Sequence, residues 1–487
     1  MSAPGRHGPR RGPSRASGES RSAQHAGTSV NAWRFDPATL AAPELERCTD
    51  PGAMRGLLQR HLPGFDTGAL RIDSVAVSKV RRNTSLHRNP CRMTLCYELG
   101  VVDTATGRSG TQLLYAKVFR AGLSEACAAP LDRHALARPR FGPGAAHVPA
   151  LDMVIWALPN DPVLSQLPVL LGDGVVDVAP WAALGMARDS VAGCRTELLR
   201  YEPEQRATLR FTIDPGGGGA SRVVYAKTFR DGRARDLFER FDHFARQAQV
   251  DAGAPLVARP LGHSEATRTL WQEAASGTPW LAWVAAHAGS AAALPMIRAA
   301  AGALALLHEA PLAPSAQTLA RTAAHWVGES RRRQNKISRA APHLSARVAR
   351  VADAIGARAE RQTARRPSLI HGDFHPDQLW VHEGRIVLFD FDEFALGDPM
   401  EDLAEFVIKL EQAGAHTGIA ASFIEAYAGC APQRFDRTRL AWHLTVQSLL
   451  QASRAFVYQR PGWEGELDGR LAACEARAAM LAETPAP

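Results

Sequence analysis

The stretch that decides the fold runs from Leu369 to Asp392 and reads Leu-Ile-His-Gly-Asp-Phe-His-Pro-Asp-Gln-Leu-Trp-Val-His-Glu-Gly-Arg-Ile-Val-Leu-Phe-Asp-Phe-Asp. Its first residues predict a short apolar strand, and the glycine and proline that follow predict a loop rather than a helix. This loop carries Asp373 and Gln378. A hairpin comes next, and its second strand ends at Asp390. The pattern therefore predicts two carboxylates and one side-chain amide at the ends of short strands.

These residue types fit the transfer of a phosphoryl group from a nucleotide. The reaction needs one carboxylate to position and deprotonate the acceptor hydroxyl, and oxygen ligands to hold magnesium on the phosphates. We predict that Asp373 is the catalytic base and that Gln378 and Asp390 are the metal ligands. The expected cofactors are ATP and Mg²⁺, and the expected enzyme is a small-molecule kinase.

The segment resembles the HGDxxxxN and DFG-like motifs of the aminoglycoside phosphotransferase and choline kinase group. Downstream, Gly397-Asp-Pro399 followed by Asp402-Leu403 is similar to that group as well. The resemblance implies an α+β, bilobal protein-kinase-like fold with a small β-rich lobe and a large α-rich lobe. It implies the catalytic aspartate at Asp373, the DFG aspartate at Asp390, and a structural aspartate that caps a helix at Asp402.

One position departs from the family pattern, because most members have Asn where this chain has Gln378. The glutamine carbonyl is still a hard oxygen ligand, one methylene further out, and maltokinase-like members look similar in using glutamine there. A catalytically silent kinase-like binding or regulatory protein is therefore the alternative function. The chain has Asp373, Asp390 and an upstream lysine, Lys227, together. A purely structural domain has no physical reason to keep all three, so their presence favours catalysis.

A lysine-bearing strand pair occurs twice in the upstream half, once at 92–122 and again at 206–232. Each copy predicts two β-strands, with Lys117 in the second strand of the first copy and Lys227 at the matching place in the second copy. Only Lys227 is followed by a helical pattern, so we predict that it contacts the α- and β-phosphates. Glu239 on that helix is its expected ion-pair partner, and a solvated helix carboxylate is the alternative. The first copy predicts an extra N-terminal lobe-like repeat that serves as a cap or intramolecular partner, and a second nucleotide site is the alternative.

Two further segments bear on nucleotide binding. Gln272, Glu273 and Ala274 resemble the hinge between lobes, where backbone groups bond the adenine edge. In a kinase-like small lobe the nucleotide-covering loop joins the first two strands, which here corresponds to residues 202–205. The tetraglycine at 216–219 instead joins the second strand to the lysine strand, so it predicts a flexible surface link rather than a phosphate cradle. The chain contains no GxxxxGK[ST] motif, which excludes a P-loop NTPase.

Bulk composition sets the remaining expectations. A chain of 487 residues with 46% hydrophobic content predicts two or three structural units. We place a disordered basic tail at 1–32, a cap with the first repeat at 33–195, a kinase-like N-lobe at 196–273 and an α-rich C-lobe at 274–487. The net charge of +8 gathers mostly in the tail and at 331–366 without interleaved aromatics, so no nucleic-acid partner is expected. The absence of a leader-like or membrane-spanning apolar run, and seven scattered cysteines, favour a cytoplasmic protein without a membrane partner.

The acceptor is expected to be the hydroxyl group of a small molecule such as a sugar, an amino alcohol or an aminoglycoside-like compound, because this fold serves all of them. Two other chemistries fit less well. A zinc pair at His371 and His375 is opposed by the glycine and proline between and beside them. A metal-binding DxD of a glycosyltransferase at Asp390 and Asp392 is disfavoured by the His-Gly-Asp segment upstream. The sequence carries no signal for an oligomeric state.

Overall fold

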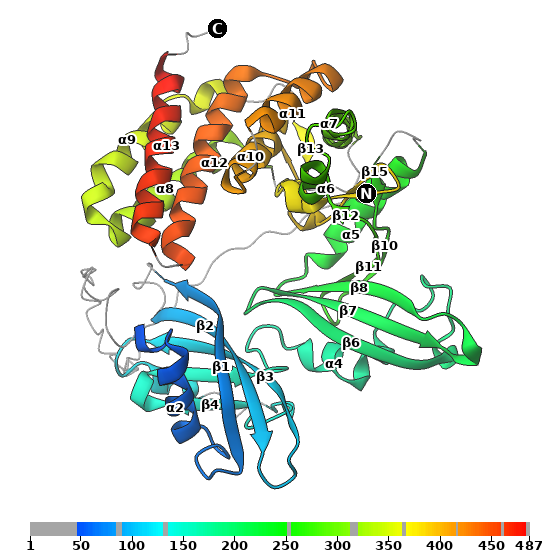
Figure 1. Ribbon diagram of the computed structural model, residues 1–487, viewed down its shortest axis with the longest axis vertical. Coiled ribbons are helices and arrows are strands. Elements are labelled where there is room, and N and C mark those ends of the chain that lie inside the picture. The colour runs from blue at the N-terminus through cyan, green and yellow to red at the C-terminus, as the bar shows by residue number, and fades with distance from the viewer. Residues whose placement is uncertain are drawn as a thin grey trace, which may run out of the picture. The chain divides into compact units, whose positions relative to one another are not determined.

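The computed structural model describes residues 46–83, 90–129, 135–250, 255–311, 320–362, 367–414, 417–458 and 462–483 (Figure 1). The tail predicted at 1–32 lies outside these residues. Everything described below belongs to one compact unit, which extends to the C-terminus from Asp36.

The first sheet is antiparallel and has the strand order β1-β2-β3-β5-β4. A helix, α2, begins with its cap Asp50, whose carboxylate accepts from the amide of Ala53 at 2.6 Å. It buries Met54 and Leu58 in a core that it shares with the sheet. The elements of this part are α2 (Pro51–His61), β1 (Leu70–Arg82), β2 (Cys91–Asp103), β3 (Ser109–Phe119), α3 (Ser124–Ala128), β4 (Ala145–Val148), β5 (Met153–Ala157) and α4 (Leu167–Leu171).

The second sheet repeats the strand order of the first. Read from β6, its order is β6-β7-β8-β11-β10. Lys117 on β3 and Lys227 on β8 both lie on the third strand of their sheets. The elements are β6 (Val191–Glu202), β7 (Arg206–Pro215), β8 (Arg222–Phe229), α5 (Ala234–Val250), β10 (Pro260–Ser264) and β11 (Thr269–Glu273). Because β6 begins at Val191, it crosses the unit boundary predicted between 195 and 196.

The two copies differ in the helix that follows the lysine strand, as the sequence predicts. After β3 comes α3, which has only five residues, whereas α5 after β8 has 17. Leu237, Phe241 and Phe244 of α5 are buried, and their spacing forms one apolar stripe of a helix. Phe241 and Phe244 of this stripe pack against Phe391, the residue after Asp390.

The remaining chain is mainly helical, so the predicted α+β class with a β-rich and an α-rich lobe is confirmed. Its helices are α6 (Trp280–Ala286), α7 (Ala293–Glu309), α8 (Ala323–Ala340), α9 (Ser345–Ala357), α10 (Pro399–Gln412), α11 (Thr417–Cys430), α12 (Arg437–Tyr458) and α13 (Trp463–Glu483). Its short strands are β9 (Leu256–Val257), β12 (Thr278–Pro279), β13 (Ser368–Ile370), β14 (Leu379–His382), β15 (Arg385–Leu388) and β16 (Ala395–Gly397). Among the described helices, none has both the length and the apolar character needed to cross a bilayer.

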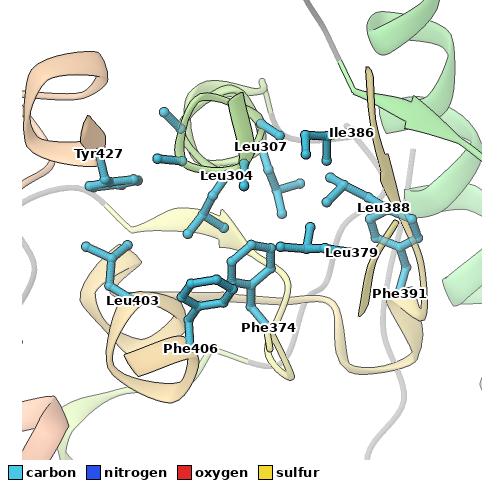
Figure 2. Close-up of a cluster of buried hydrophobic side chains, with 14 of the residues drawn as sticks. Leu304, Leu307, Phe374, Leu379, Ile386, Leu388, Phe391, Leu403, Phe406 and Tyr427 are labelled. Atoms are coloured by element: carbon cyan, nitrogen blue, oxygen red, sulfur yellow. The ribbon is translucent and has the colours of Figure 1, made fainter. Parts of the chain in front are cut away.

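One buried cluster fixes the loops that carry the predicted site. Phe374 and Phe391 directly follow Asp373 and Asp390 in the chain, and both rings are buried (Figure 2). The ring of Phe391 lies 4.5 Å from that of Phe241 on α5. The ring of Phe374 lies 5.2 Å from that of Phe406 on α10. Burying an aromatic ring of this kind stabilises the fold by about 1.5–3 kcal/mol. The position of each aspartate is thus set by the apolar residue next to it.

Candidate active site

The loop that begins at His371 is held by a close approach of two chain segments. Gly372 has a φ of +79°, and a Cβ atom there would lie 2.2 Å from the carbonyl oxygen of Glu393. The guanidinium group of Arg321 donates to the carbonyl oxygen of Gly372 at 2.8 Å. His371 is buried, and its Nε2 donates to the carbonyl oxygen of Phe389 at 2.7 Å. Only glycine fits this position without moving its neighbours, and the buried His371 side chain ties the loop to the chain that follows β15.

Asp402 also fixes the loop. Its carboxylate accepts from the amides of His371 at 2.7 Å and Gly372 at 2.9 Å, and from Nε2 of His308 at 3.0 Å. The helix cap predicted for Asp402 is made instead by Asp398, which has extended backbone angles and accepts from the amide of Met400 at 3.0 Å. Asp402 comes one turn later, where its side chain points toward the loop.

The catalytic loop presents Asp373 beside a histidine and an amide. The carboxylate of Asp373 is 29% exposed, and its Oδ2 lies 3.8 Å from Nε2 of His375. Nε2 of His375 lies 3.0 Å from Nε2 of Gln378. That amide nitrogen of Gln378 lies 3.5 Å from Oδ2 of Asp390. The structure therefore brings together Asp373, Gln378 and Asp390, the three residues predicted for catalysis and metal binding.

Asp390 lies two residues after β15 in a left-handed conformation, with a φ of +58°. There it meets the lysine strand, because Nζ of Lys227 donates to Oδ1 of Asp390 at 2.6 Å and to Oδ1 of Asp392 at 2.9 Å. Lys227 is only 8% exposed. The predicted phosphate-binding lysine and the predicted metal ligand are thus in direct contact across more than 160 residues of chain.

The charges of this cluster are coupled. Burial disfavours the charge of Asp390, but the Lys227 ammonium outweighs it and lowers the pKa of that carboxyl. Burial also disfavours the charged form of Lys227, while Asp392 and Asp390 raise its pKa overall. At Asp392 burial prevails, helped by the charge of Asp390, and raises the pKa to about 6. The cluster keeps Asp390 ionised, which is the state that a metal ligand needs.

Asp392 and Arg206 were not predicted for this site. Asp392 is buried and forms a second ion pair with Nη1 of Arg206 at 3.0 Å. The only sequence signal was the spacing of Asp390 and Asp392, which also fits a metal-binding DxD. Arg206 is the first residue of β7, and the residues around it do not indicate an ion pair. Its partner, Asp392, lies 186 residues away in the sequence.

Glu239 does not fill its predicted role. It is exposed on α5, and the ion pairs that Lys227 makes within the described residues are those with Asp390 and Asp392. The reason is the orientation of the helix: Leu237 and Phe241 face the core, so Glu239 between them points to solvent.

The predicted hinge residues lie where the chain leaves the second sheet for the α-rich lobe. Gln272 and Glu273 are the last residues of β11, and Gln272 pairs with Tyr225 of β8. The amide of Glu273 donates to the carbonyl oxygen of Arg259 at 2.9 Å, and its carboxylate pairs with that arginine at 2.8 Å. Ala274 is exposed and follows directly. The amide of Glu273 is therefore already in use within the sheet.

The turn between β6 and β7 is tied to the first sheet. Lys117 forms a close ion pair with Glu204, a turn residue with a φ of +59°. Asp161 accepts from the hydroxyl of Tyr201 at 2.6 Å and from the amide of Glu204 at 2.9 Å. This turn was predicted to correspond to the nucleotide-covering loop. Lys117 thus ties the first sheet to a turn of the second sheet.

The residues present fit a magnesium site on a nucleotide. Mg²⁺ is usually held by one or two carboxylates together with substrate phosphates and waters. Asp390 supplies a carboxylate, and a half-turn of the Gln378 amide would present its oxygen, Oε1, toward Asp390 in place of Nε2. The described residues contain no cluster of three or more His, Cys, Asp or Glu side chains suited to a metal. The donor set therefore suits a metal that is shared with phosphate oxygens.

Comparison with solved structures gives several aminoglycoside phosphotransferases and a related kinase. A thermostable mutant of APH(4)-Ia in a ternary complex with ADP and hygromycin B is 17% identical, with a TM-score of 0.39, over 61% of this chain and 96% of that one. The gentamicin complex of APH(2″)-IIa is 13% identical, with a TM-score of 0.42, over 61% and 92%. A choline/ethanolamine kinase family protein from Mesorhizobium loti is 15% identical, with a TM-score of 0.39, over 63% and 95%.

These likenesses have low identities and TM-scores below 0.5, so they carry no functional argument. A comparison with curated proteins returned no match. The family comparison is more informative, because it matches residues 206–443, from the first residue of β7 to the middle of α12. This span contains Lys227, Asp373, Gln378 and Asp390. The resemblance predicted from the sequence is thus confirmed: residues 206–443 match the phosphotransferase enzyme family.

Proposed function

We propose that this protein is an ATP-dependent phosphotransferase that moves the γ-phosphate of ATP to a hydroxyl group of a small molecule. The observation that supports the proposal most strongly is the contact of Lys227 with Asp390 at 2.6 Å, with Gln378 beside Asp390 and Asp373 on the exposed side. The family match at 206–443 adds support.

Each residue has a separate role in this proposal. Asp373 orients the acceptor hydroxyl and accepts its proton as the oxygen attacks the γ-phosphorus. Lys227 neutralises charge on the α- and β-phosphates, and the buried pair with Asp392 keeps its ammonium in place. Asp390 and Gln378 would hold magnesium, which supplies neutralisation of the charge that develops on the β- and γ-oxygens. Ala274 and the other hinge residues would receive the adenine.

Nucleotide binding and turnover test this proposal separately. ATP with Mg²⁺ is expected to stabilise the wild-type protein by about 2.7 kcal/mol at a hundred times Kd, measured as a shift in the unfolding midpoint. Asp390→Ala removes that stabilisation, because the metal loses its carboxylate. Asp373→Asn keeps the stabilisation but lowers phosphoryl transfer by about 10²–10⁴-fold.

A neighbouring residue offers the matched control. Asp377 lies in the same loop with an 88% exposed side chain, so Asp377→Asn should change neither binding nor turnover. A wild-type protein that ATP and Mg²⁺ do not stabilise would rule out the enzyme. Stabilisation without transfer to any acceptor would instead support the catalytically silent binding protein, which the family departure at Gln378 suggests.

A further inference from the structure

A basic region adjoins the catalytic loop at Lys409. Lys409 on α10 interacts electrostatically with Asp373 and Asp377 of the catalytic loop. Arg454 on α12 interacts with Lys409 and with Glu405, one turn before Lys409. Both cations come from long helices that pack against each other, so their positions are set by the fold.

These two cations line a small hollow of about 180 Å³. The polar residues of its wall are Lys409, Gln412, Gln451, Arg454, Glu466 and Arg470. Arg470 is already paired with Glu466 at 2.5 Å. The wall therefore presents two unmatched positive charges together with two amide groups that can donate hydrogen bonds.

Among the described residues, neither Lys409 nor Arg454 forms an ion pair, and the carboxylates of Asp373 and Asp377 act on Lys409 only through longer-range electrostatic attraction. Burial, with Arg454 adding to it, lowers the pKa of Lys409, and Glu405 and Asp373 oppose this only in part. Glu405 is buried, and burial together with the charge of Asp373 raises the pKa of its carboxyl well above the usual range.

The basic character continues beyond the hollow. Arg454 interacts with Arg333 on α8, and Arg333 interacts with Lys336 one turn later on that helix. Burial, followed by the charges of Arg333 and Arg81, lowers the pKa of Lys336 to about 8. A positive potential of this extent repels a polycationic acceptor and attracts an anion.

We propose, resting on the phosphotransferase function above, that the acceptor is a small hydroxyl compound that carries an anionic group. Lys409 and Arg454 bind its carboxylate, phosphate or sulfate, and a hydroxyl of the same molecule faces Asp373. The hydroxyl oxygen forms the new bond to the γ-phosphorus, the bond from that phosphorus to the β-phosphate oxygen breaks, ADP leaves, and Asp373 takes the proton. The small volume of the hollow, about 180 Å³, suits an anionic group rather than a whole oligosaccharide.

A matched set of sugars tests the charge preference. Glucose, glucosamine, glucuronate and glucose 6-phosphate differ mainly in charge, and the last two separate a carboxylate from a phosphate. Their binding to the full-length protein with ADP and Mg²⁺ is measured by calorimetry, and their turnover by ADP release with ATP. We expect the two anions to bind about tenfold more tightly than glucose, as charge-assisted hydrogen bonds do, and glucosamine to bind most weakly.

Two variants test whether Lys409 and Arg454 of the hollow cause the preference for an anionic acceptor. Lys409→Gln and Arg454→Gln should each weaken binding of the preferred anion about tenfold, raise its KM, and leave the affinity for ATP and Mg²⁺ unchanged. Arg437→Gln is the control, because Arg437 is an exposed arginine at the start of the same helix as Arg454. An equal or stronger affinity for glucose or glucosamine, or variants that bind the anion like the wild type, would overturn the inference.

The proposed function has its own readout in the same experiment. If ATP with Mg²⁺ does not stabilise the wild-type protein, the phosphotransferase itself is refuted. If ATP binds but the anions show no advantage over glucose, the phosphotransferase stands and only the anionic acceptor is refuted.

Discussion

At the scale of single residues, the site depends on backbone positions that the side chains alone do not reveal. Gly372 and Gly384 have similar φ values, +79° and +75°. A Cβ at Gly372 would meet the carbonyl oxygen of Glu393 at 2.2 Å, whereas nothing lies within 4 Å of one at Gly384. The two glycines therefore separate the effect of a strained conformation from that of a steric clash.

We predict that Gly372→Ala lowers the free energy of unfolding by more than about 3 kcal/mol and that Gly384→Ala lowers it by about 1–2 kcal/mol. The alanine at position 372 also displaces the amides that Asp402 holds, so phosphoryl transfer should fall further than stability does. Urea unfolding and ADP release measure the two effects. Equal losses of stability in both variants would show that the close approach of position 372 to the carbonyl oxygen of Glu393 does not add to the destabilisation.

At the scale of elements, the twin lysine strands β3 and β8 share a place in their sheets but not their partners. Lys227 contacts the two carboxylates beside the catalytic loop, and Lys117 contacts the turn between β6 and β7. We predict that Lys227→Met lowers kcat by about 10²–10³-fold, the loss typical of a removed transition-state contact. Lys117→Met should raise the KM for ATP with little effect on kcat, because it frees only the turn.

Steady-state kinetics with varied ATP distinguish the two lysine variants. Glu204→Gln provides a check on Lys117→Met, because it removes the same Lys117–Glu204 ion pair by changing the other partner. It should give a similar KM for ATP. If Lys117→Met instead lowered kcat as much as Lys227→Met does, the first strand pair would be part of a nucleotide site rather than a support for the turn.

The elements also show what the sequence could and could not predict. Local patterns correctly predicted the strands that bear Lys117 and Lys227, the helix after the second of them and the hairpin that ends at Asp390, because each depends on neighbouring residues. The partner of Lys227 was missed, since a carboxylate at Glu239 is near in sequence while Asp392 is near only in space. The role of Asp402 was missed for the same reason, because its bonds reach back to the loop at His371.

At the scale of the whole molecule, the two five-stranded sheets share one buried cluster. Tyr115 and Trp156 of the first sheet, and Leu209 and Phe211 of the second, belong to it together with Leu167 of α4. A core that is shared in this way unfolds as one unit. A substitution that destabilises the first sheet should therefore also destabilise the lobe that carries Lys227.

The helix α4 offers a test of that coupling. Leu167 is fully buried in the shared cluster, whereas Val169 on the same helix is 39% exposed. We predict that Leu167→Ala lowers the free energy of unfolding by about 2–5 kcal/mol, the range for a leucine removed from a core, and that Val169→Ala changes it by less than about 0.5 kcal/mol. Unfolding is followed by circular dichroism and by the loss of bound nucleotide. Coincident curves with a lowered midpoint in Leu167→Ala would show one cooperative core, and two separate transitions would show that the first sheet unfolds independently of the second.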